Sequence, residues 1–120
     1  SGGEHEFTRY GFQQIIDMDA MDILQPDLRR CGGFTEARKI AALASASGLT
    51  VIPHAYCITH LHFAAAMTNI PMVEYFPLPC WAEPAPANWH QPFLDEPVPV
   101  NAHVTLPTKP GLGVRANLAR

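Results

Sequence analysis

Four ionisable residues stand out because each falls where a short strand is expected to end. They are Glu4, Asp27, His54 and Glu74, and Asp27 and His54 each come directly after a proline. A hydrogen next to a carboxylate is a very weak acid, so its removal requires a positioned base and a cation that stabilises the developing enediolate. A histidine and three carboxylates could supply both the base and a site for the cation.

The chemistry of each side chain suggests its role. Histidine changes charge near neutral pH, so we assign His54 as the base. Asp27 could fix the tautomer of the imidazole and raise its basicity. Glu74 could hydrogen-bond the substrate carboxylate and stabilise the enediolate. Glu4 is a hard oxygen ligand, which suits Mg²⁺.

Helical patterns separate these four residues. Phe12, Ile15 and Ile16 share one face, which predicts an amphipathic helix over residues 9–18. A second helix is predicted over residues 35–47, with Thr35 as its N-cap and Gly48 as its end. A third is predicted over residues 59–67.

Short apolar segments alternate with these helices and predict strands. The strands are expected at residues 22–25, 50–52 and 72–75, with another that ends near Gly3. Alternating strands and helices with short loops predict a parallel sheet, here half of a (β/α) barrel. Active sites of such barrels lie at the C-terminal ends of the strands, which is where the four ionisable residues fall.

The C-terminal part of the chain has a different composition. Residues 77–120 hold 9 of the 12 prolines, which excludes long helices there. We therefore predict two parts: a partial (β/α) barrel over residues 1–76 and an extended tail over residues 77–120. Trp81 and Trp89 are expected to pack that tail onto a capping region or a neighbouring subunit. The chain opens on Ser1 without a methionine, so we expect it to be an interior piece of a longer protein.

Composition excludes several other classes of function. The chain is 48% hydrophobic with a net charge of −3 and no basic cluster, which argues against nucleic-acid or anionic-membrane partners. No apolar run is long enough to span a bilayer. The three widely spaced cysteines favour neither a disulfide framework nor structural zinc, so we predict a cytoplasmic protein. His60 and His62 lie two positions apart on a predicted helix, where they face different directions, so we expect one exposed, one partly buried and no metal between them.

These residues resemble the enolase superfamily, and within it the mandelate racemase branch. Gly3-Glu4 resembles the motif of the third metal ligand. Asp27, His54 and Glu74 follow at separations of 23, 27 and 20 residues, which fit that branch. Further segments resemble the L-rhamnonate dehydratase family, namely residues 3–6, 25–27, 31–33, 68–71, 96–101 and 109–114. The resemblance covers nearly the whole chain.

The resemblance implies a Mg²⁺-dependent hydro-lyase that converts a small sugar acid, L-rhamnonate, to a 2-keto-3-deoxy acid. It implies Glu4 as a metal ligand, His54 as the base, Asp27 as its partner and Glu74 as the transition-state stabiliser, in a parent enzyme that is a homo-oligomer. The other two metal ligands and the capping residues would precede Ser1. The proton for the departing hydroxyl could come from His54 or from His5, which we also place at the substrate.

Two alternatives remain open from the sequence. One is another acid-sugar dehydratase or a racemase of the same superfamily, and a racemase would need a second base on the opposite face of the substrate. The other is a catalytically incompetent chain that acts only as a binding or packing module, since one of three metal ligands is present. The upstream sequence and a titration with Mg²⁺ would distinguish them.

Overall fold

Parallel strands in chain order form the centre of the molecule. The computed structural model describes residues 1–76 and 93–118. Strand β1 (Ile23–Leu24) pairs in parallel with β2 (Thr50–Val51), and Gly2 forms an isolated parallel bridge to Leu24. On the far side of β2, the Val51 N–H donates to the Asn69 carbonyl at 3.1 Å. Neighbours in chain order are what the wall of a parallel barrel requires, which agrees with the predicted fold.

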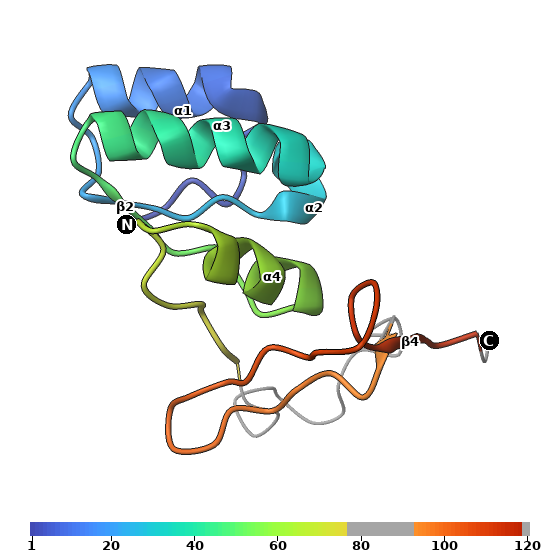
Figure 1. Ribbon diagram of the computed structural model, residues 1–120. Helices are drawn as coiled ribbons and strands as arrows, with labels where there is room; N and C mark the ends of the chain where they lie inside the picture. Colours follow the sequence, from blue (N-terminus) through green and yellow to red (C-terminus); the bar gives the residue numbers. More distant parts are fainter. Residues whose placement is uncertain (77–92, 119–120) are drawn as a thin grey trace, which may run out of the picture.

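Helices connect these strands, as the hydrophobic pattern predicts. Their bounds are Thr8–Asp17 for α1, Leu28–Cys31 for α2, Gly33–Ala46 for α3 and Ile58–Ala66 for α4. Figure 1 shows α1 and α3 running side by side on one side of the strands, with α4 nearer the C-terminal segment. Each βαβ connection thus returns the chain to the next parallel strand.

A single apolar core lies between the helices and the strands. Phe12 of α1, Ile40 of α3 and Val51 of β2 are fully buried in it. Helix α3 buries three alanines, and small side chains allow its backbone to approach both α1 and the sheet. The core side chains, which span residues 12–70, are Phe12, Ile15, Leu24, Leu28, Cys31, Ala37, Ile40, Ala41, Ala44, Val51, Phe63 and Ile70.

The predicted start of the second helix is wrong by two residues, and the short helix α2 was not predicted. Asp27 is the N-cap of α2, because its side chain accepts a hydrogen bond from the Arg29 N–H. Gly32 then adopts a left-handed conformation (φ 113°), which ends α2 and begins α3 without a linker. Thr35 therefore lies inside the first turn of α3. One turn of helix is too short to give a periodic signal in the sequence.

The strand predicted at residues 72–75 is also wrong. That segment has no ladder pairing in the described part of the chain. The chain runs beside β2 only at Asn69, before the predicted strand begins. Glu74 is instead connected to the neighbouring loop through its side chain.

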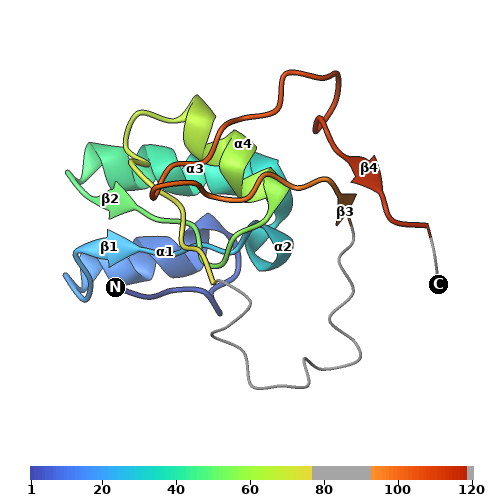
Figure 2. The ribbon, with the colours of Figure 1, turned by 90° about the horizontal axis from the view of Figure 1, so that it is seen from below.

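The C-terminal segment forms a small structure of its own. Strands β3 (Phe93–Leu94) and β4 (Arg115–Ala116) pair in antiparallel register. Figure 2 shows this segment passing along α4 before it reaches β4. The predictions for Trp81 and Trp89 lie outside the described residues.

Candidate active site

Two loops at the C-terminal ends of β1 and β2 carry the central residues of the site. Hydrogen bonding between the strands continues beyond them, since the Ile52 N–H donates to the Leu24 carbonyl at 2.9 Å and the His54 N–H to the Pro26 carbonyl at 3.2 Å. Pro26 and Pro53 are both fully buried. The backbone therefore fixes Asp27 and His54 side by side, as parallel strand ends should.

His54 lies between two carboxylates. Its Nδ1 is 3.9 Å from Asp27 Oδ2, and its Nε2 is 3.9 Å from Glu74 Oε2. Both separations are longer than a hydrogen bond. The Nδ1 atom is buried without a hydrogen-bond partner, while the side chain as a whole is 31% exposed. One ring nitrogen therefore faces the interior beside Asp27, and the other faces the more open side beside Glu74.

Asp27 is buried and held by Arg29. Its carboxylate is 2% exposed and accepts from Arg29 Nε at 3.0 Å, Arg29 Nη2 at 2.8 Å and the Arg29 N–H at 2.8 Å. Burial raises the pKa of Asp27, but the neighbouring His60 and these Arg29 contacts outweigh it and hold the pKa well below its usual value. Asp27 therefore stays a carboxylate across the neutral range.

Glu74 is anchored to the loop that carries His54. Its Oε2 accepts a hydrogen bond from the Ala55 N–H at 2.8 Å, and its side chain is 29% exposed. Ala55 itself has a positive φ of 57°. Glu74 thus reaches His54 through a side-chain contact, although its backbone is not in a strand.

Glu4 and His5 lie in a turn that starts at Gly3. The Glu6 N–H donates to the Gly3 carbonyl at 3.0 Å, and Gly3 has a φ of 105°. A Cβ on Gly3 would lie 2.8 Å from the ring of Phe12, so this position requires glycine. His5 is exposed, and its Nδ1 lies 3.1 Å from Arg30 Nη1.

Arg30 links the turn of Glu4 and His5 to Asp27, because its Nη1 lies 3.1 Å from His5 Nδ1 and its Nε lies 3.9 Å from Asp27 Oδ2. The pKa of Glu4 is lowered, chiefly by its own backbone N–H and then by the nearby His54, His5 and Arg30. Glu4 is therefore an anion beside the other predicted site residues. All five predicted residues, Glu4, His5, Asp27, His54 and Glu74, thus belong to one region at the strand ends.

The residues that the structure describes do not by themselves complete a metal site. No group of three or more His, Cys, Asp or Glu side chains in residues 1–76 and 93–118 could hold a metal ion. Glu4 fits one position of an oxygen-ligated Mg²⁺ site, which normally needs further carboxylates and water.

Two residues at the site were missed by the sequence analysis. Arg29 binds both oxygens of Asp27, and its position two residues after an aspartate that follows proline is a signal for such a local pair. His60 is fully buried, with its Nε2 3.4 Å from Asp27 Oδ1, and His62 is not exposed either, so the expectation of one exposed and one partly buried histidine is wrong. His62 is half-buried and contacts the Leu112 carbonyl at 3.0 Å.

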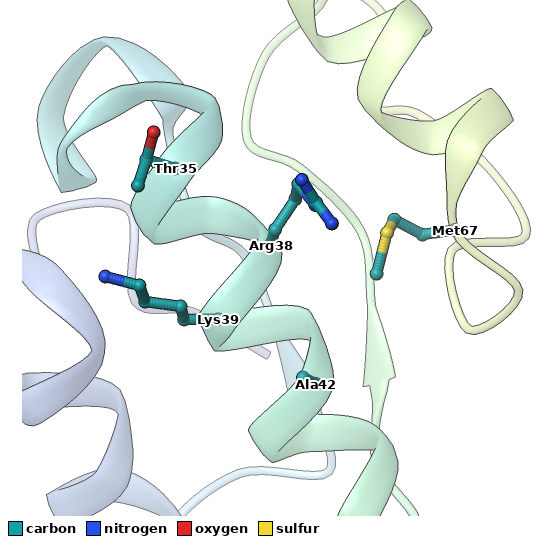
Figure 3. Close-up of a pocket in the computed structure, with 5 residues that line it drawn as sticks. All are labelled: Thr35, Arg38, Lys39, Ala42 and Met67. Atoms are coloured by element: carbon teal, nitrogen blue, oxygen red, sulfur yellow. The ribbon is translucent and has the colours of Figure 1, made fainter.

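A groove between α3 and the end of α4 is separate from this cluster. It is lined by Thr35, Arg38, Lys39, Ala42 and Met67 (Figure 3), none of which is a predicted site residue. Arg38 points toward Met67, while Lys39 is turned away and pairs with Glu36 at 2.8 Å. Its cationic side chains converge on no common point.

In the described ranges, residues 1–76 and 93–118, no helix has the length and apolar character needed to cross a membrane.

Comparisons with known proteins place the chain in a family. The chain is 44% identical over 115 residues to an L-rhamnonate dehydratase from Saccharopolyspora erythraea, an alignment that covers 96% of the chain and 30% of that protein. The chain thus spans about a third of the length of the curated relative it matches.

Two solved structures share the fold of this chain. An enolase from Agrobacterium radiobacter, bound to sodium and L-malate, matches with a TM-score of 0.81 and 28% identity over 96% of this chain and 32% of that one. A rhamnonate dehydratase from Gibberella zeae, complexed with Mg, matches with a TM-score of 0.76 and 34% identity over 97% of this chain and 29% of that one. The model of the enolase C-terminal domain-like family matches residues 1–120, and the chain belongs to that family.

Proposed function

We propose that this chain carries the acid–base residues of a Mg²⁺-dependent acid-sugar dehydratase whose substrate is L-rhamnonate. The observation that carries the proposal is the position of His54, with one ring nitrogen facing Asp27 and the other facing Glu74 at the ends of neighbouring strands. The likeness to dehydratases of sugar acids supports the same class of reaction.

His54 is the base in this proposal. With its Nδ1 proton directed toward Asp27, the lone pair of Nε2 faces the open side and takes the proton from C2 of the substrate. The Asp27 carboxylate favours that tautomer and stabilises the imidazolium that forms. The 3.9 Å separation has to shorten by about 1 Å for a hydrogen bond, which is common when substrate binds.

Arg29 and Glu74 support the Asp27–His54 pair in different ways. The guanidinium of Arg29 keeps Asp27 ionised and limits how strongly it can pull on the histidine. Glu74, fixed by the Ala55 N–H, lies where it can hydrogen-bond the substrate carboxylate as that group becomes an enediolate. A protonated Glu74 would donate this bond.

Glu4 is proposed as one Mg²⁺ ligand, with the others supplied from outside the described residues. When bound, Mg²⁺ would withdraw electron density from the substrate carboxylate and so acidify the C2 proton. The lowered pKa of Glu4 keeps it in the anionic form that such binding needs.

Elimination also needs a proton for the departing hydroxyl. The C3–O bond breaks, the hydroxyl leaves as water after receiving one proton, and the resulting enol becomes the 2-keto-3-deoxy acid. His54 could return the proton it took, or His5 could donate one from the turn beside Glu4. Comparing His5→Asn with His54→Asn for elimination and for C2 exchange would distinguish them.

The direct test uses the full reading frame that encodes this chain. The purified protein is incubated with Mg²⁺ and a panel of acid sugars, and formation of 2-keto-3-deoxy acid is measured. We expect L-rhamnonate to react and His54→Asn to lower kcat by about 10²–10⁴-fold, the usual contribution of a general base. His62→Asn, on α4, is the matched control.

Other outcomes would change the assignment. If the C2 proton exchanges with deuterium but no dehydration occurs, His54 remains the proposed base and the proposed reaction changes, for example to racemisation. Absence of both would withdraw the roles of Glu4, Asp27, His54 and Glu74. The chain alone, with one carboxylate ligand, is expected to bind Mg²⁺ weakly or not at all in calorimetry, as a binding or packing module would.

A further inference from the structure

His60 connects the two loops that carry Asp27 and His54. It lies in the first turn of α4 and is fully buried. Its Nε2 accepts a hydrogen bond from the Leu28 N–H at 2.9 Å, and its Nδ1 is 2.6 Å from the Ala55 carbonyl. Leu28 directly follows Asp27, and Ala55 directly follows His54. A single imidazole therefore joins the backbones of both loops.

These backbone partners define the tautomer of the ring. A backbone N–H can only donate and a carbonyl can only accept, so Nε2 presents a lone pair to Leu28 and Nδ1 carries a proton for Ala55. Asp27 Oδ1 lies farther from Nε2, at 3.4 Å, and Cys57 Sγ lies 3.2 Å from Nδ1. The shorter contact at each nitrogen is the one to the backbone.

Two titratable groups pull against this neutral form. Burial lowers the pKa of His60, but Asp27, Cys57 and the Ala55 carbonyl outweigh it and raise that pKa to about 9. A second proton on Nε2 would point at the Leu28 N–H and would break that hydrogen bond. The Leu28 N–H can only donate and lies 2.9 Å from Nε2, so this contact opposes the second proton, and the hydrogen-bond geometry favours the neutral ring.

We propose that His60, as the neutral Nδ1–H tautomer, is a positioning residue that sets the placement of Asp27 relative to His54. It touches neither the substrate nor the reacting nitrogen of His54, so it acts only through the two loops. The inference rests on the proposed function for its kinetic readout but not for its spectroscopic one. It explains why a polar side chain occupies a helix position that otherwise faces the apolar core.

The kinetic test compares variants of the full reading frame. His60→Leu removes both hydrogen bonds and keeps an apolar volume, and we expect kcat to fall on the order of 10–100-fold, as for other residues that orient catalytic ligands. KM should change little, because no substrate contact is lost. His60→Gln keeps an acceptor for Leu28 and should restore part of kcat. His62→Leu, on the same helix but bonded to the Leu112 carbonyl, should leave kcat unchanged.

The spectroscopic test needs no substrate. In protein labelled with ¹⁵N-histidine, His60 should show one protonated nitrogen, Nδ1, and a slowly exchanging proton at neutral pH. The His54 ring resonances should move in His60→Leu and stay in place in His62→Leu. If wild-type protein turns over no sugar acid, the proposed function fails while these resonances still test the positioning role.

Several results would overturn the inference. A doubly protonated His60 would contradict the neutral link to Leu28. Unchanged His54 resonances in His60→Leu, or an equal loss of kcat in His62→Leu, would show a general effect of the helix. If His60→Leu does not fold, the ring nitrogens of wild-type His60 decide, and a proton on Nε2 or a rapidly exchanging proton on Nδ1 would sink the proposal.

Discussion

The two described regions of this chain are held together in different ways. Among the described residues, all buried hydrophobic side chains lie between residues 12 and 70, while no residue of 93–118 is buried. The C-terminal segment is instead attached by hydrogen bonds to the loop after β2 and to α4. Tyr56 donates to the Pro97 carbonyl at 2.7 Å, and Glu96 accepts from the Ile58 N–H at 3.0 Å.

The core and the C-terminal segment therefore have different effects, one on the stability of the fold and the other on the position of a single loop and helix start. Apolar burial sets the fold of residues 1–76, because its contribution grows with the area removed from water. The C-terminal segment contributes few such contacts and acts on a short stretch, residues 56–62, which follows His54. We expect core substitutions to unfold the protein and tail substitutions to loosen that stretch locally.

The largest expected effect comes from the core. Phe12→Ala in the full reading frame should lower the free energy of unfolding by about 3–5 kcal/mol, because it removes a fully buried ring and leaves a cavity. Val98→Ala is the matched tail variant, since Val98 is 68% exposed, and should change it by less than about 0.5 kcal/mol. Chemical denaturation measures both, and equal losses would erase the contrast.

The next effect depends on pH. The folded pKa of Asp27 lies below the ordinary 3.8, so its stabilisation is present above pH 3.8 and is lost as pH falls through the folded value. Asp27→Asn should cost about 1–2 kcal/mol at neutral pH, where charge-assisted bonds to a half-exposed Arg29 are removed, and progressively less in acid.

Its control is Asp95→Asn in the C-terminal segment. Asp95 also pairs with an arginine, Arg115, at 2.7 Å, but both side chains are exposed. We expect no measurable change in stability at any pH there. A pH-independent loss in Asp27→Asn would show that shape and not charge matters at that position.

A smaller effect tests how the C-terminal segment caps α4. Glu96→Ala removes the acceptor for the Ile58 N–H and should cost about 1 kcal/mol, the usual size of an N-cap contribution. Glu96→Gln keeps an acceptor oxygen and should lose less. Hydrogen exchange of the Ile58 N–H reports the local change. Equal protection of that N–H in Glu96→Ala and Glu96→Gln would contradict the role of Glu96 as a cap of α4.

The smallest effect concerns Tyr56. Burial raises the pKa of Tyr56 to about 12, so its hydroxyl stays protonated and donates to Pro97 over the whole usable pH range. Tyr56→Phe should cost about 0.5–1 kcal/mol. Proteolysis within residues 93–118 should become faster, while the Tm of the protein should change little. A reversed pattern would place Tyr56 in the core instead.

The sequence predicted the elements that depend on local signals. The periodicity of Phe12 and Ile15 predicted α1, and the alternation of apolar runs with helices predicted the parallel arrangement that the family comparison confirms. The four ionisable residues were found because each falls at an expected strand end. Their roles stay predictions, although the structure gathers them in one region.

Only the tertiary structure decided which side chains of the site contact one another. Arg29 takes both oxygens of Asp27, so the expected hydrogen bond to His54 is a 3.9 Å approach, and His60 becomes a link between two loops. Sequence patterns record which face of an element is apolar, because the free energy of burying an apolar side chain depends little on its orientation toward its neighbours. Hydrogen bonds depend on distances of a few tenths of an ångström between segments about 30 residues apart, and only the packed chain sets those.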